Sequence, residues 1–187
     1  PISVGAVVQN VGTALAVYEA VQKNKPLIDN TITVTGQVSP SQKNYLTRVG
    51  TPYKDIIAAA GGFPDGNIKV ISGGPMMGRA VSNLDATTLK GTGAVLMLSE
   101  EQTKRKPAQA CISCGRCVDA CPMGLEPFYL LRLSRAGMMD ALEENAVQDC
   151  IECGCCLYSC PSSIALLDEI RLAKASVMKI IKSRPRK

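Results

Sequence analysis

Apolar and polar positions alternate in two different ways along the first half of the chain. The apolar stretch from Ile2 to Val8 predicts an opening strand. Residues 12–24 then carry apolar side chains at helical spacing, and this pattern stops at Lys25-Pro26. Residues 27–38 alternate β-branched and polar side chains, which predicts a second strand.

The next elements are short and are separated by glycine-rich turns. Residues 52–60 predict a helix, and residues 68–71 and 92–98 predict two strands. We therefore expect a small mixed α+β domain over about residues 25–100. The segment Lys104-Arg105-Lys106-Pro107 is a plausible linker to the C-terminal part of the chain.

The C-terminal part has helical periodicity. Pro127 suits the first position of a helix and Gly137 suits its end, while residues 140–146 predict a second short helix. A long helix is expected after Pro161, capped by Ser162 or Ser163. Its predicted apolar face consists of Ile164, Leu167, Ile170, Val177 and Ile181.

Composition limits the chemistry that the chain can perform. Apolar residues make up 46% of the sequence but aromatic ones only 4%, so aliphatic side chains must build the core. The absence of histidine excludes classical catalytic triads. No apolar run approaches the roughly 20 residues of a membrane-spanning helix, and the start at Pro1 suggests a fragment of a longer protein.

Charge is unevenly distributed. Residues 107–173 carry 4 basic and 9 acidic side chains, whereas residues 174–187 carry six basic and no acidic ones. We expect this basic tail to meet an anionic membrane or an acidic partner and to be dispensable for packing. A solvated helix end, with cations favoured by the helix dipole, is the alternative.

The strongest signal is a doubled cysteine motif. All nine cysteines follow residue 110, and eight of them form CxxCxxCxxxCP twice, at Cys111, Cys114, Cys117 and Cys121 and at Cys150, Cys153, Cys156 and Cys160. In this pattern the fourth cysteine of each run closes the other run's 4Fe-4S cluster. We therefore predict one cluster on Cys111, Cys114, Cys117 and Cys160, and a second on Cys150, Cys153, Cys156 and Cys121.

Other residues of the motif have supporting roles. Each proline is expected to lead directly into the next helix, and Gly115 and Gly154 are expected to let backbone amides approach the cluster. Cys155 is expected to be a packed thiol that points away from the cluster. Zinc also binds CxxC pairs, but it has no use for a third such spacing followed by Cys-Pro. Disulfides do not suit an intracellular chain with this pattern.

The motifs also resemble a known family. CISCGRCVDACPMGLEPFYL and DCIECGCCLYSCPSSIALLDEIRLAKA, with VVQNVGTALAVYEAV, TVTG and ISGGPMMG, are similar to the C subunit of the Rnf ion-translocating electron-transport complex. The resemblance implies an α+β chain with three parts. These are a remnant of a Rossmann-like FMN and NADH domain at 1–24, a β-grasp (SLBB) domain at 25–103, and an α-helical ferredoxin domain with two 4Fe-4S clusters at 107–187.

The same resemblance implies which flavin contacts remain. The glycine-rich loop that cradles the flavin phosphate is missing from this sequence, and Asn10-Val11-Gly12-Thr13 resembles the flavin-site NVET of a complex I subunit. Asn10 and Thr13 are therefore candidate remnants of an FMN contact. FMN itself is expected only in the full-length protein.

We thus expect an electron-transfer subunit of a membrane-associated NADH:ferredoxin-type oxidoreductase, which alone would be only an electron carrier. Its expected partners are other Rnf subunits, including a ferredoxin-like B subunit, and NADH through the missing domain, with no nucleic acid. It would lie at the cytoplasmic face of the cell membrane, peripherally. A cobalamin reductase-like SLBB and iron–sulfur protein and a zinc-stabilised interaction module are the alternatives.

Overall fold

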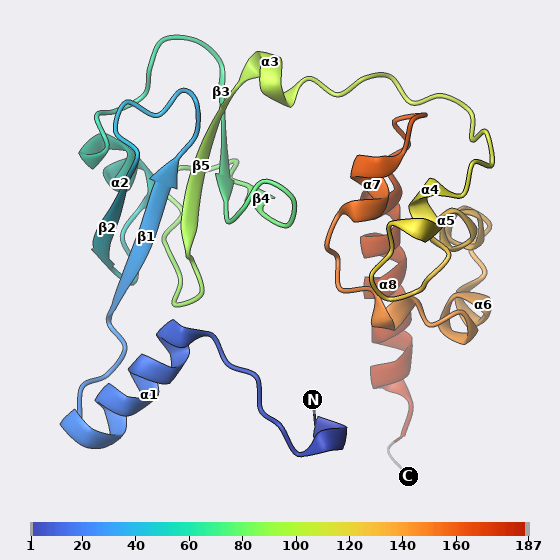
Figure 1. The fold of residues 1–187 in the computed structure, drawn as a ribbon, viewed down its shortest axis with the longest axis horizontal. Coiled ribbons are helices and arrows are strands. Elements are labelled where there is room, and N and C mark those ends of the chain that lie inside the picture. The colour runs from blue at the N-terminus through green and yellow to red at the C-terminus, as the bar shows by residue number, and fades with distance from the viewer. Residues whose placement is uncertain (1, 186–187) are drawn as a thin grey trace. The chain divides into compact units, whose positions relative to one another are not determined.

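The computed structural model describes residues 2–185, apart from the side chain of Ile2. The chain divides into two compact units, Pro1–Thr103 and Lys104–Lys187, which are described separately (Figure 1). Pro1 and two cations of the basic tail, Arg186 and Lys187, lie outside the described residues.

The N-terminal unit starts with two helical segments, η1 (Ile2–Val4) and α1 (Val11–Lys23). The predicted strand at residues 2–8 is therefore wrong: its valines are exposed, and a strand needs both a pairing partner and a face to bury. The predicted helix is confirmed. Asn10 caps its first turn and Asn24 ends it in the left-handed conformation, at φ 49°.

The centre of this unit is a five-stranded sheet in the order β2-β1-β5-β3-β4 (Figure 1). Its strands are β1 (Asp29–Thr35), β2 (Lys43–Arg48), β3 (Ile68–Ser72), β4 (Arg79–Ala80) and β5 (Ala94–Ser99). β1 and β5 pair in parallel at the middle, and β2 and β3 flank them antiparallel. Parallel central strands bordered by antiparallel ones form the predicted β-grasp arrangement.

Helix α2 (Tyr53–Ala59) supplies the other half of the core. Ile32 and Val34 of β1 point to the same face because side chains alternate along a strand, and both are fully buried. They pack with Ile56 and Ile57 of α2 and with Met97 of β5. One face of the sheet is thus the core of the N-terminal unit.

The sequence did not predict β2 or β4. β2 has the sequence KNYLTR, and only Tyr45 of it packs against the core. An edge strand buries few side chains, so its hydrophobic alternation is weak. β4 is a two-residue strand paired with β3, too short to leave a pattern.

Beyond α3 (Glu100–Thr103), every regular element described in the C-terminal unit is a helix. Its elements are α4 (Arg116–Asp119), α5 (Pro127–Arg135), α6 (Met139–Glu144), η2 (Val147–Asp149), α7 (Cys155–Ser159) and α8 (Leu166–Ser183). Helix α8 packs against α5, α6, α7 and η2. Pro127 begins α5 as predicted. Gly137, at φ 70°, lies just beyond its end, where the Gly137 and Met138 N–H groups satisfy carbonyls of the last turn.

Two expectations for the helix starts are wrong. Neither Ser162 nor Ser163 caps α8: Ala165 occupies the capping position, and no side chain bonds the first turn there. Nor do the Cys-Pro steps lead directly into helices, because α5 and α8 begin at Pro127 and Leu166, after an intervening turn. Left-handed residues in those turns, Gly124 and Ser163, redirect the chain first.

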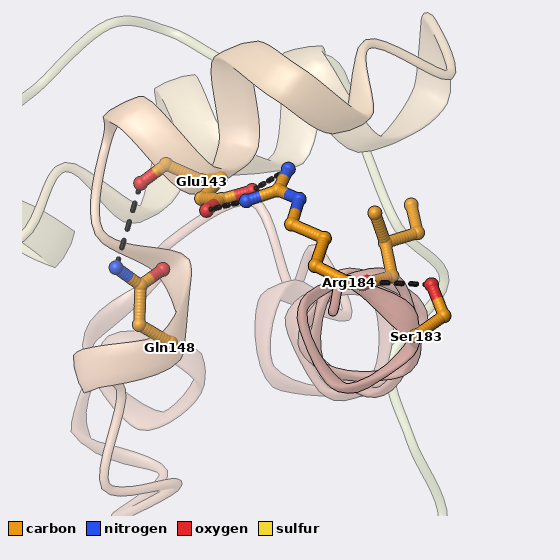
Figure 2. A network of polar contacts seen from close by, with 5 residues as sticks. Glu143, Gln148, Ser183 and Arg184 are labelled. Carbon is orange, nitrogen blue, oxygen red and sulfur yellow. Dashed lines mark hydrogen bonds and ion pairs between the residues drawn. The ribbon is translucent and has the colours of Figure 1, made fainter. Parts of the chain in front are cut away.

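The basic tail is not dispensable for packing, which corrects a further expectation. Val177 of α8 belongs to the core, and Ile181 packs against it. Arg184 donates two hydrogen bonds to the carboxylate of Glu143 on α6, at 2.6 and 2.8 Å (Figure 2). Removing residues 174–187 would therefore open the core as well as remove charge.

Gly36 provides a sharp test of the sheet. It has φ +124°, and a Cβ at this position would lie 2.0 Å from the Met97 carbonyl oxygen of β5. We expect Gly36→Ala to lower the free energy of unfolding at least about 2 kcal/mol more than Gly50→Ala does. Gly50 also has positive φ, but a Cβ there meets nothing within 4 Å. Equal urea denaturation midpoints for the two variants would contradict the close approach of β1 and β5.

Candidate iron–sulfur centre

The two cysteine runs lie in equivalent structural surroundings. Each position of the first run recurs 39 residues later, so that Cys111 corresponds to Cys150 and Cys121 to Cys160. A short helix, α4 or α7, lies inside each run, and a longer one, α5 or α8, begins six residues after its last cysteine. The chain therefore builds the same cysteine frame twice.

The backbone repeats as closely as the sequence. Ser113 and Gly115 in the first loop have φ 54° and 74°, and Glu152 and Gly154 in the second have φ 57° and 82°. Alternation of left-handed and ordinary residues turns successive backbone N–H groups toward one side and forms a concavity that suits an anion. Anionic iron–sulfur clusters are a group of this kind.

Four cysteines of the two runs line one cavity. Cys150, Cys153 and Cys156 of the second run share it with Cys121 of the first, and Leu125, Leu130, Leu167 and Ile170 form apolar walls. The backbone N–H of Leu125 also points at the Cys121 sulfur, at 3.4 Å. This structure thus brings together the four cysteines predicted for the second cluster.

The cysteines predicted for the first cluster, Cys111, Cys114, Cys117 and Cys160, do not line this cavity. Cys117 is partly buried, and burial raises the pKa of its thiol, with a smaller contribution from the nearby Cys160. The backbone of Phe128, in the first turn of α5, lowers the pKa of Cys117 and partly offsets the effect of burial. Cys111 and Cys114 are exposed, so the first run is the more open of the two.

Burial also favours the protonated form of two of the cavity cysteines. It raises the pKa of Cys156 to about 11 and raises that of Cys150 as well, against an ordinary value of 9.0. A metal ligand must be a thiolate, so binding of iron has to displace these protons. Hydrogen bonds from backbone N–H groups to sulfur then favour the charged ligand.

Cys155, which is expected to be a packed thiol that points away from the cluster, is only partly buried. A hydrogen bond to the Cys153 thiol raises its pKa, followed by the effect of burial. It is absent from the lining of the cavity that holds Cys153 and Cys156. Cys155 therefore lies beside the second set of cysteines and outside the cavity.

The other candidate groups have simpler surroundings. Within residues 2–185, no three Cys, Asp or Glu side chains come close enough to hold a single metal ion. Asn10 accepts the N–H of Gly12 at 2.9 Å as the cap of α1, and Thr13 is exposed on that helix. Capping accounts for Asn10, and a flavin contact by either residue stays a prediction. No helix in the described part of the chain combines the length and apolarity needed to cross a membrane.

Sequence reasoning missed one charged network at this site. Glu152 of the second loop pairs with Arg171 at 2.9 Å and with Lys174 at 3.6 Å, both on α8. Lys174 also donates a 2.6 Å hydrogen bond to the Cys150 carbonyl oxygen. Alignment of the two runs at their offset of 39 residues would have drawn attention to these positions.

Comparison with known families assigns both units. Residues 31–80 match the SLBB domain, and residues 110–164 match a 4Fe-4S dicluster domain. Another 4Fe-4S dicluster model matches residues 79–126, but much of that stretch belongs to the sheet unit. The match at 110–164, which spans both cysteine runs, therefore carries the assignment. The chain is an iron–sulfur protein in which an SLBB domain precedes a domain for two 4Fe-4S clusters.

Similar individual proteins identify the family of iron–sulfur proteins more closely. The chain is 44% identical over 144 residues to the C subunit of the proton-translocating ferredoxin:NAD(+) oxidoreductase complex of Clostridium ljungdahlii. It is 41% identical over 136 residues to the C subunit of the ion-translocating oxidoreductase complex of Rhodobacter capsulatus. It is 39% identical over 145 residues to the C subunit of the Na(+)-translocating ferredoxin:NAD(+) oxidoreductase complex of Acetobacterium woodii.

These matches cover 77, 73 and 78% of this chain. The chain belongs to the family of C subunits of the ion-translocating oxidoreductase complexes, as its motifs predicted. The matched regions make up 32, 26 and 33% of those relatives, so the chain spans about a third or less of their length.

Gly115 can be substituted to test whether the first loop needs its left-handed backbone or its lack of a side chain. A Cβ at Gly115 would meet no protein atom within 4 Å, so there is space for a side chain. What the structure requires at this position is a residue that can adopt a φ of +74°. We expect Gly115→Asn to retain most of the bound iron, because asparagine tolerates the left-handed conformation. Gly115→Val should lose much of it. Equal iron loss in both variants would instead favour close approach of the backbone to the cluster.

Proposed function

We propose that this chain carries electrons through two 4Fe-4S clusters as part of an ion-translocating oxidoreductase complex. One cluster is held by Cys111, Cys114, Cys117 and Cys160, and the other by Cys150, Cys153, Cys156 and Cys121. The complete protein would link NADH to a ferredoxin-type partner. The clusters act as carriers, so the residues around them contribute binding, orientation and electrostatics.

The cavity lined by Cys121 together with Cys150, Cys153 and Cys156 is the observation that carries this proposal. Three of these cysteines are close in sequence, and the fourth comes from the other run. A pattern in which each fourth cysteine closes the neighbouring cluster is typical of two-cluster ferredoxins. Cys160 raises the pKa of Cys117, which supports the same exchange in the other direction.

The surroundings suit one-electron transfer. Apolar walls limit the access of water to the second set of cysteines, and the Leu125 N–H directed at the Cys121 sulfur stabilises negative charge on that ligand. Burial and hydrogen bonding are the means by which a protein sets a cluster's reduction potential. No substrate has to reach the iron for this role.

The proposed partners follow from the relatives. Two of them are named as subunits of ferredoxin:NAD(+) oxidoreductase complexes. We infer that other subunits of such a complex, including a ferredoxin-like B subunit, exchange electrons with this chain, and that it meets the membrane peripherally at the cytoplasmic face. NADH and FMN are assigned to the part of the relatives that this chain does not span.

Ligand exchange between the runs is tested by two serine variants. We expect Cys121→Ser to damage the cluster of the second run and Cys160→Ser that of the first, each lowering bound iron from about eight toward about four atoms per chain. Anaerobic iron and sulfide analysis gives the content. EPR of the reduced protein, compared with Cys150→Ser and Cys111→Ser, shows which cluster is missing.

Cys155→Ser is the matched control, because Cys155 lies beside the same cysteines but outside the cavity. It should keep both clusters. Loss of a cluster in this variant, or a Cys121→Ser spectrum like that of Cys111→Ser, would overturn the ligand assignment.

Peripheral membrane contact is tested without disturbing the core. Lys179 and Lys182 are exposed on α8, whereas Lys174 and Arg184 are held by Cys150, Glu152 and Glu143. Replacing both exposed lysines by Gln should weaken binding to anionic vesicles about thirtyfold, since each cation near such a surface contributes about 1 kcal/mol and about 1.4 kcal/mol is a factor of ten. Cosedimentation at low and high salt measures this. Unchanged binding would remove these lysines from the proposal, and iron content checks the fold.

A further inference from the structure

The two cysteine loops have the same backbone conformation, but they differ in the side-chain contacts that hold them to the neighbouring helix. In the second loop, Lys174 donates to the Cys150 carbonyl oxygen at 2.6 Å, and Arg171 donates to Glu152 at 2.9 Å. Glu152 also lies 3.6 Å from Lys174. These contacts thus tie Cys150 and Glu152, two residues of the Cys150-x-x-Cys153 turn, to α8.

These contacts are more protected than other ion pairs of the chain. The side chains of Glu152, Arg171 and Lys174 are each less than 30% exposed. In every other ion pair found among residues 2–185, at least one partner is more exposed than that, as with Arg105 and Asp168 at 63 and 44%. Shielded charged hydrogen bonds stabilise a structure more than exposed pairs do.

The first loop keeps the cations and lacks the carboxylate. At the offset of 39 residues, Arg132 and Arg135 on α5 correspond to Arg171 and Lys174, but Ser113 stands where the second loop has Glu152. Arg135 pairs instead with Glu169, at 3.6 Å. In the described chain, no hydrogen bond or ion pair joins either arginine to the first loop.

Exposure of the cysteines follows the same asymmetry. Cys111 and Cys114 are exposed, whereas Cys150 and Cys153 are only partly so. Cys156 is buried, and its counterpart Cys117 is not. Release of a cluster requires its loop to open and water to reach the iron, and both are easier at the first loop.

We propose that Glu152, Arg171 and Lys174 form a clamp that holds the second cysteine loop closed over its cluster. The unclamped first loop is then the site from which iron is lost and replaced first. The three residues are positioning residues, since they act on the cluster through the loop. This inference rests on the presence of the two clusters proposed above.

The test follows release of the individual cysteines. The whole chain, loaded with both clusters, is exposed anaerobically to EDTA, and samples are alkylated with iodoacetamide and analysed by peptide mass spectrometry. Cys111, Cys114 and Cys117 should be alkylated before Cys150, Cys153 and Cys156. Simultaneous release of the two loops, or earlier release of the second, would overturn the clamp.

Variants then assign the difference to the clamp. Lys174→Met removes a charged hydrogen bond, so release of the second loop should become about tenfold faster. Lys174→Arg should largely restore slow release, and Lys179→Met, on an exposed position of the same helix, should leave it unchanged. Equal acceleration of both loops by Lys174→Met would show a general loss of packing and overturn the proposal.

A gain of function keeps the proposal testable if Lys174→Met fails to assemble its cluster. Ser113→Glu places a carboxylate at the position of Glu152, with the same left-handed backbone and with Arg132 and Arg135 at the corresponding positions of α5. It should slow release of the first loop, and unchanged release would contradict the clamp.

Cys121 and Cys160 separate this inference from the ligand assignment. Release of Cys160 together with the first loop supports the proposed exchange between the runs. Release of Cys121 with the first loop would overturn that exchange, but the order in which the two loops open would still decide the clamp.

Discussion

The apolar contact between α5 and α8 supports both the core of the C-terminal unit and its cysteine cavity. Leu130 of α5 and Ile170 of α8 are almost completely buried, and both also line the cavity. Cluster ligands must be held at fixed separations, and only a well-packed interior keeps side chains in single conformations. Packing and ligand placement therefore depend on the same side chains.

Comparison of the two cysteine runs shows which features of a cysteine loop are retained and which differ. Left-handed backbone recurs at corresponding positions of both loops, although the residues are serine in one and glutamate in the other. Backbone direction is what turns N–H groups toward an anion, so it is retained. The other side chains are free to differ between the loops. They hold the second loop to α8 and leave the first loop more exposed.

How much of the fold the sequence predicts depends on whether each element buries a row of apolar side chains in the core. β1, β3 and β5 have a face in the core, so their hydrophobic spacing predicted them. β2 lies at the edge of the sheet and left little pattern, while the apolar residues 2–8 suggested a strand that does not form. The start of α8 was misplaced because the chain first turns at Ser163, and that turn carries no periodic signal.

The sequence by itself determined the type of site, because eight cysteines at two sets of spacings have few other chemical uses. It also determined the order of the units and the existence of most helices. Only the tertiary structure decided that Cys121 shares a cavity with Cys150, Cys153 and Cys156, and that Lys174 bonds to the second loop. Spacing along the chain fixes which residues are near neighbours in one turn, whereas contacts between distant turns depend on how α5 and α8 pack together.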